Sequence, residues 1–258
     1  MVEEKLAQKK EELEKEIKRN NQYIVMKEIA QIRKLSLWIF FIPFLAINLC
    51  LIISQNSQFL DGTFFTVDQI GKSGFTIPYL DGSLSISRAS RTFPQYLVFK
   101  PAMILTAVLL TIYWQNNNSL INNLNSTNFN HKFKIFGILS AIFLAIHSML
   151  LGVKFDIQIY KLFRRVVLLL FIIFEIIAQG ILVYHLYKLK FKLENLILKK
   201  VLILKIILVI ILGSVAILSL PILITKGNTH FKHALEWNYF VGVVSFYLFS
   251  RFFWKKTK

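Results

Sequence analysis

The chain has 258 residues, of which 55% are hydrophobic and only 17% are charged, and 31 Lys and Arg against 14 Asp and Glu give it a net charge of +17. Its apolar residues come in uninterrupted blocks about as long as the ~20 residues that a helix needs to cross a bilayer, which excludes an ordinary soluble enzyme. The single cysteine, Cys50, excludes an intramolecular disulfide framework and a cysteine-based zinc site. No nucleic-acid-binding module accompanies the positive charge, so we attribute the charge to membrane topology and expect no nucleic-acid partner.

The first 34 residues are charged and are expected to form a solvated cytoplasmic helix that extends the first membrane span. Apolar residues recur there at near-heptad spacing, and opposite charges stand four residues apart, which supports a helix. These residues are Leu6, Leu13, Ile17 and Ile24, and the pairs Glu11 with Lys15 and Glu14 with Lys18. The segment lacks the apolar stretch of a signal peptide. A coiled coil that docks a cytoplasmic protein partner stays open as the alternative.

Six apolar segments follow and predict an all-α fold, a polytopic membrane protein with a six-helix transmembrane bundle over residues 35–258. Inside a bilayer every backbone N–H and C=O group needs a partner within its own segment, so blocks of this length are expected to be helical. The expected spans are residues 35–54, 96–114, 133–151, 166–187, 201–224 and 234–254. The polar, Asn-rich stretch QNNNSLINNLNSTNF after the second span is predicted to be a neutral spacer loop.

The charges of the loops predict that both termini are cytoplasmic. Lys and Arg concentrate in the cytoplasmic loops of membrane proteins, and this orientation puts the basic stretches KLKFKLENLILKK and RFFWKKTK on that side. The segment KFDIQIYKLFRR is a basic loop that falls on the opposite side. We therefore expect a multi-pass integral membrane protein, in the cell membrane as the first choice and in an endomembrane as the alternative.

Three ionisable residues inside different spans are expected at one depth, near the outer interface. Burying a charge at the bilayer centre costs roughly 2.5–3.5 kcal/mol, so such residues are candidates for function. Lys100, His147 and Glu236 fall close to the outer ends of their spans, and Arg88 and Arg91 lie just before the second span. Together they are predicted to contact a lipid or another ligand, and the arginines suit a phosphate. Pairing of Lys100 with Glu236, and simple packing of His147, stay open as structural alternatives.

Glu175 is expected about 15 Å deep, near the middle of the membrane, because it stands ten residues after Arg165 on a helix that rises ~1.5 Å per residue. At that depth a carboxyl group is protonated, paired or facing water. Gln179 lies one turn further on the same face and is predicted to hydrogen-bond it. For Glu175, a functional role and a structural role in joining helices stay equally open. Lys205, near the cytoplasmic start of its span, is expected to extend to the interface.

The sequence carries no signature of a known catalytic site, such as the G-x-S-x-G, H-E-x-x-H, Walker A or Rossmann glycine patterns. It also lacks paired short spans broken by Gly or Pro, which are typical of inverted-repeat transporters. We expect no catalytic residue, no metal site and no cofactor, and we leave open whether any reaction is catalysed.

The stretch IPYLDGSLSISRASRTFPQYLVFKPAMILTAVLLTIYW, residues 77–114, resembles the DRAM/FRAG/CWH-like (FRAG/DRAM/SFK-type) family of six-span membrane proteins. The matching residues look like Ile86, Ser87, Pro94, Phe99 and Tyr113, and in the last span Glu236 with Trp237 resembles an acidic–aromatic pair of the family. The chain departs from the family at Ala89 or Ser90, where a Gly is common, and in KLFRR, where a His is common. The resemblance implies a multi-pass protein of plasma, Golgi or lysosomal membranes, linked to lipid organisation, lipid remodelling of GPI anchors or regulation of autophagy.

These observations favour a protein that engages lipid headgroups on the outer side and modulates membrane lipid organisation or processing, with membrane lipids as its partners. One alternative is a small proton-coupled transporter that uses Glu175, His147 and Glu236 as a relay. The other is a membrane scaffold in which the N-terminal helix docks a cytoplasmic protein. Whether Lys100, His147 and Glu236 face one cavity distinguishes contact with a ligand from separate structural pairs.

Overall fold

The chain folds as a bundle of long helices. The computed structural model describes residues 2–56, 75–124, 132–153, 157–225 and 227–255, and these ranges contain eight helices and no β-strand. The helices are α1 (Val2–Gln55), α2 (Pro78–Asp81), α3 (Ile86–Ser90), α4 (Gln95–Leu124), α5 (Lys132–Leu150), α6 (Gln158–Lys188), α7 (Lys199–Ile224) and α8 (Thr229–Phe253). The all-α prediction is therefore confirmed for the described residues.

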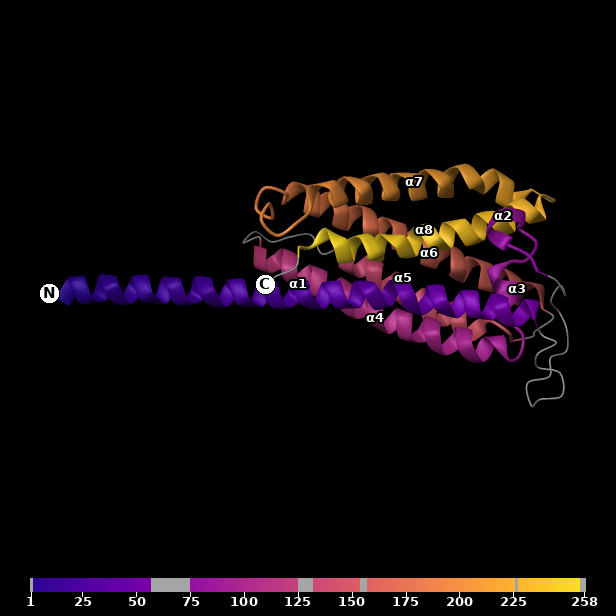
Figure 1. Ribbon diagram of the computed structural model, residues 1–258, viewed down its shortest axis with the longest axis horizontal. Coiled ribbons are helices and arrows are strands. Elements are labelled where there is room, and N and C mark those ends of the chain that lie inside the picture. The colour runs from indigo at the N-terminus through magenta and orange to yellow at the C-terminus, as the bar shows by residue number, and fades with distance from the viewer. Residues whose placement is uncertain (1, 57–74, 125–131, 154–156, 226, 256–258) are drawn as a thin grey trace.

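The six long helices alternate in direction along one common axis, and both chain termini lie at the same end of the bundle (Figure 1). α1 packs on α4 and α8, and α5 packs on both α4 and α6. α7 packs against α6 and α8. The short helices α2 and α3 lie at the opposite end from the termini, in contact with α8 and α1. We call this end, which carries α2 and α3, the loop end, and the other end the terminal end.

Within the described residues, five helices are long and apolar enough to cross a membrane, namely α1 and α4 to α7. α8 covers the sixth expected span with 25 residues but is not among the five, so the count of six stays a prediction. Large apolar side chains remain exposed on the outside of the bundle, where a lipid environment would accept them. On α7 these are Ile203, Leu204, Ile207, Ile210, Ile211, Ile217, Leu218 and Leu220. The fold is thus compatible with a multi-pass membrane protein.

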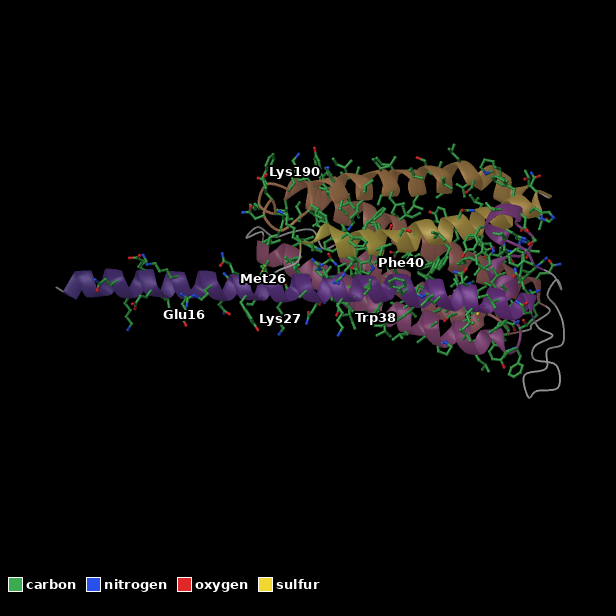
Figure 2. The ribbon with its side chains drawn as sticks, viewed as in Figure 1. Glu16, Met26, Lys27, Trp38, Phe40 and Lys190 are labelled. Atoms are coloured by element: carbon green, nitrogen blue, oxygen red, sulfur yellow. The ribbon has the colours of Figure 1, made fainter. Side chains whose placement is uncertain are left out.

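α1 is one continuous helix of 54 residues, so the charged N-terminal segment and the first span form a single rod. In Figure 2, Glu16 lies on the part of α1 that projects beyond the bundle, whereas Trp38 lies where the helix runs along it. Burial of side chains begins at Val25 and continues at Ile29. Packing against the bundle therefore starts before residue 35, the boundary expected from the apolar pattern.

α4 continues ten residues past the second expected span, so the prediction of a spacer loop is wrong for residues 115–124. The rest of that stretch, residues 125–129, lies outside the described residues. Polar side chains of the helical part contact α1: Ser119 and Asn123 donate to the carboxylate of Glu28, and Asn116 Nδ2 lies 3.4 Å from Gln31 Oε1. The asparagines therefore join α4 to α1 at the terminal end.

Buried aromatic rings from three helices pack together in the interior of the bundle. Tyr113 and Trp114 of α4 meet Tyr247 of α8 edge to face, with ring centroids 5.0 and 6.4 Å away, and Trp114 also lies 6.4 Å from Phe133 of α5. Such pairs add about 0.5–1.5 kcal/mol beyond the burial of their area. α5 comes close to Trp114 at Gly137, where a side chain would collide with the indole ring. The rings fix how α4, α5 and α8 pack around the polar groups described below.

Candidate functional site

The first turns of α8 hold the segment 79–84 by side-chain hydrogen bonds to its backbone carbonyl groups. The four donors each contact a different carbonyl: His230 Nδ1 to Asp81 O at 3.1 Å, His233 Nδ1 to Gly82 O at 3.0 Å, Trp237 Nε1 to Leu84 O at 2.8 Å, and Asn238 Nδ2 to Tyr79 O at 2.8 Å. We call these residues together the loop clasp. Because α3 follows directly after this segment, the loop clasp determines where α3 lies.

The turn after α2 is closed by the carboxylate of Asp81. It accepts hydrogen bonds from the backbone N–H groups of Ser83, at 2.8 Å, and Ile77, at 3.3 Å. These bonds hold the pKa of Asp81 below its usual value. Gly82 follows with a φ of 58°, in the left-handed region that favours glycine. The turn thereby brings the chain back against α8.

Glu236 of α8 holds the start of α3. Its carboxyl group accepts hydrogen bonds from the backbone N–H groups of Ile86 and Ser87, two of the donors that a helix start leaves unpaired. The hydroxyl group of Ser85 caps the next one, with Arg88 N at 3.2 Å. Glu236 is therefore a positioning residue for α3, and its partner is this helix start and not Lys100.

Replacing Glu236 by alanine is expected to loosen α3, because two N–H groups lose their acceptor and an unsatisfied buried donor costs about 1–3 kcal/mol. Glu236→Gln keeps one acceptor oxygen and is expected to have a smaller effect. Hydrogen–deuterium exchange of the amides of residues 86–90 measures the difference. Equal protection of these amides in the alanine variant and the natural protein would show that Glu236 does not hold the helix.

Three arginines gather at the loop end from separate parts of the sequence. Arg88 lies on α3, Arg91 between α3 and α4, and Arg164 on the second turn of α6. Partial burial, together with the charges of Arg88 and Arg164, lowers the pKa of Arg91. A methyl group at Gly152 would stand 2.9 Å from the carbonyl oxygen of Arg91, so the turn after α5 contacts the same connection. Among the described residues, no carboxylate is ion-paired with any of the three.

His147 of α5 lies beside one of these arginines, Arg164. It is buried, and its ring faces both the backbone and the guanidinium group of Arg164. Its Nδ1 atom and Nε of Arg164 are buried without a hydrogen-bond partner among the described residues. We call Arg88, Arg91, Arg164 and His147 the arginine cluster. It offers positive charge and one buried donor, Arg164 Nε, that has no acceptor among the described residues.

Lys100 does not belong to the arginine cluster. Its ammonium group lies over the ring of Tyr96, 5.4 Å from the centroid, on the first turns of α4. Lys100, His147 and Glu236 therefore each have a different partner: an aromatic ring, an arginine and a helix start. The sequence predicts that these three residues lie at one depth, but in the structure they share no contact partner.

A second polar site lies in the middle of the bundle, around Glu175 of α6. Gln179 Nε2 donates to Glu175 Oε1 at 2.9 Å, which confirms the hydrogen bond predicted from their spacing. The hydroxyl group of Tyr247, on α8, donates to the same oxygen. Ser140 Oγ, on α5, lies 2.5 Å from Glu175 Oε2. Glu175 is 1% exposed, so three helices enclose its carboxyl group completely.

Lys205 of α7 lies next to this site, on the side of the terminal end. The prediction that its side chain extends to the membrane interface is wrong. It is 1% exposed, and its Nζ atom donates to Ser250 Oγ at 2.7 Å. The ammonium group also lies 4.1 Å from the ring centroid of Phe246. Ser250 Oγ lies 3.0 Å from the hydroxyl oxygen of Tyr113, whose ring packs on Tyr247. We call the set Tyr113, Ser140, Glu175, Gln179, Lys205, Tyr247 and Ser250 the buried network.

Sequence reasoning did not assign Arg164, the two tyrosines or the two serines to a site, and it expected Lys205 at the interface. The adjacent Arg164 and Arg165 could have been noticed as a pair that opens a span. A tyrosine hydroxyl group inside an apolar segment also requires a partner, which points to Tyr113 and Tyr247. No sequence pattern indicated which helices would supply the partners.

A shallow groove of about 440 Å³ between α1 and α4 contains none of these residues. It is lined by Gln31, Lys34, Leu35, Trp38, Leu109, Ile112 and Asn116. Figure 2 places Trp38 on the edge of the bundle, away from α7. The groove therefore takes no part in either candidate site.

The chain matches no family model, no curated protein and no solved structure. The resemblance to the DRAM/FRAG/CWH-like family therefore stays a prediction.

Proposed function

We propose that this protein is a multi-pass membrane protein that binds the phosphate-bearing headgroup of an anionic lipid at its loop end, through the arginine cluster. The observation that carries the proposal is that Arg88 and Arg164 lie close enough to Arg91 for their charges to act on it, while no carboxylate among the described residues is ion-paired with any of the three. Guanidinium groups bind phosphate oxygens with paired, charge-assisted hydrogen bonds. Binding there would let the protein modulate lipid organisation or processing, the role that the family resemblance implies.

The orientation proposed from the loop charges puts this site in the outer leaflet. Both termini lie at the other end of the bundle, where the basic stretches around Lys188–Lys200 and Arg251–Lys255 also stand. If the terminal end is cytoplasmic, α3 and the start of α6 meet the outer headgroups. The loop clasp and Glu236 support the site, because they position α3 without forming an ion pair with its arginine, Arg88.

We expect the triple variant Arg88→Ala, Arg91→Ala, Arg164→Ala to lose its preference for anionic over zwitterionic lipid by about tenfold or more. A hydrogen bond to a charged group contributes about 1.5–3 kcal/mol, and ~1.4 kcal/mol corresponds to a factor of ten. The preference can be measured as the fraction of spin-labelled phosphatidylglycerol, against phosphatidylcholine, that is immobilised by the protein in bilayer discs.

Arg165→Ala is the matched control, because Arg165 is the exposed neighbour of Arg164 on the same helix turn. It removes one positive charge from the loop end without touching the arginine cluster. We expect Arg165→Ala to retain the anionic preference. Equal preference in the triple variant and the natural protein would overturn the proposal.

A proton-coupled carrier that uses Glu175, His147 and Glu236 as a relay is less well supported. Glu236 bonds to α3, His147 lies beside Arg164, and Glu175 bonds to Ser140, Gln179 and Tyr247. No described contact joins these three sites.

A further inference from the structure

We propose that Glu175 is a proton-binding site in the membrane interior, a carboxyl group that takes up and releases a proton while the bundle stays folded. This inference concerns the buried network and does not depend on lipid binding by the arginine cluster. It rests on three observations. No described cation is ion-paired with the carboxyl group, and one hydrogen-bond partner, Ser140, can either donate to it or accept from it. The other partners can bond to the carboxyl group whether it is protonated or ionised.

Glu175 lies far from both ends of its helix. It stands 17 residues after Gln158 and 13 residues before Lys188, which at ~1.5 Å per residue is about 26 Å and 20 Å along α6. No described cation is ion-paired with it. An isolated carboxylate is strongly disfavoured in such surroundings, whereas the protonated form is neutral. The position therefore favours a bound proton.

Ser140 is the partner that can reverse its role. Its hydroxyl oxygen lies 2.5 Å from Glu175 Oε2 and 2.9 Å from the carbonyl oxygen of Gly137. A hydroxyl group has one proton and can also accept. When Glu175 is protonated, it donates to Ser140, and Ser140 donates to Gly137. When Glu175 is ionised, the Ser140 hydroxyl group turns and donates to Glu175 Oε2.

The other partners of the carboxyl group serve both states without change. Gln179 and Tyr247 donate to Glu175 Oε1, the oxygen that carries no proton in either state. No oxygen of the carboxyl group is left unpaired when the proton leaves to water, and the carboxylate then accepts three hydrogen bonds. The site can therefore change its charge without leaving one of its oxygens buried and unsatisfied.

Few other ionisable groups surround the site. Tyr247 on α8 contacts Glu175 directly, and Tyr113 on α4 packs against Tyr247. Lys205 on α7 is held separately, by Ser250 and the ring of Phe246. α5 contributes Ser140, which does not titrate. Because Ser140 lies on α5, gain or loss of the proton reverses the hydrogen bond that joins α6 to α5, whereas the bond from Tyr247 of α8 stays in place.

Infrared difference spectroscopy of the full chain in bilayer discs tests the proposal. A pH step is expected to convert a protonated-carboxyl C=O band into carboxylate bands, and Glu175→Gln is expected to remove this conversion. Ser140→Ala is expected to shift the C=O band, because the protonated carboxyl group loses its acceptor. Glu194→Gln changes an exposed loop carboxylate and is the control that leaves the band in place.

Two results would overturn the proposal. In one, Glu175 has only carboxylate bands at every pH at which the protein is folded. In the other, its C=O band persists unchanged over the same range, so that the group is permanently neutral. If Glu175→Gln does not fold, Glu175→Asp and Ser140→Ala identify the band by its shift, and a titrating C=O band that neither variant shifts also overturns the proposal.

Discussion

Gly137→Ala is expected to destabilise the bundle by about 1–3 kcal/mol or more, the usual range for overpacking a core. A Cβ atom at this position would lie 2.3 Å from Cδ2 and 2.4 Å from Cγ of Trp114. The indole ring cannot move aside, because it is fully buried between the rings of Tyr113, Phe133 and Tyr247. The free energy of unfolding in bicelles, followed by tryptophan fluorescence, measures the loss.

Gly213→Ala is the matched control for this prediction. Gly213 lies inside α7, and a Cβ atom there meets nothing within 4 Å. Alanine is the better helix former by about 0.8–1 kcal/mol, so this variant is expected to be as stable as the natural protein or slightly more stable. If Gly137→Ala unfolds with the same free energy as Gly213→Ala, the close approach of α5 to Trp114 is not required.

Gly82→Ala is expected to detach the loop clasp and lower stability by several kcal/mol. A Cβ atom would lie 1.7 Å from the carbonyl oxygen of His230, which is backbone and cannot rotate away. The residue also has a φ of 58°, which adds about 1–2 kcal/mol of strain for a residue other than glycine. The variant is expected to lose protection of residues 78–90 against hydrogen exchange, in addition to its lower unfolding free energy.

Gly227→Ala separates the two causes of destabilisation expected for Gly82→Ala, which are the collision with the backbone of His230 and the strain of a positive φ. Gly227 also has a positive φ, of 96°, but a Cβ atom there meets nothing within 4 Å. It is expected to show backbone strain without the collision. Equal losses in the two variants would mean that the contact between the turn after α2 and α8 is unimportant. A larger loss for Gly82→Ala would assign the difference to this contact.

The positions of the helices could be predicted from the sequence because a bilayer imposes a length on every apolar block. Five of the six expected spans lie in helices that are long and apolar enough to cross a membrane. Where the prediction failed, polar residues continued a helix: residues 115–124 extend α4 because Ser119 and Asn123 have an acceptor on α1, Glu28. Composition alone does not reveal such a partner.

The candidate sites were harder to predict, because their contacts join residues far apart in the chain. Trp237 bonds to Leu84 and Tyr247 to Glu175 across 153 and 72 residues. The bond between Glu175 and Gln179 was predictable because both lie on one helix. Lys205 was misjudged because a long side chain near a helix end usually extends to water, whereas here Ser250 and Phe246 lie on the inward side.

The unbroken course of α1 has a mechanical consequence. Residues 8–24 are exposed wherever their side chains are described, and the 23 residues before Val25 form an arm about 35 Å long at ~1.5 Å per residue. No loop separates this arm from the part of α1 that packs in the bundle, so a 10° tilt of α1 would move the far end of the arm by about 6 Å. A small tilt of α1 against α4 and α8 therefore becomes a large displacement of the arm beyond the bundle, and a force on the arm acts directly on that packing.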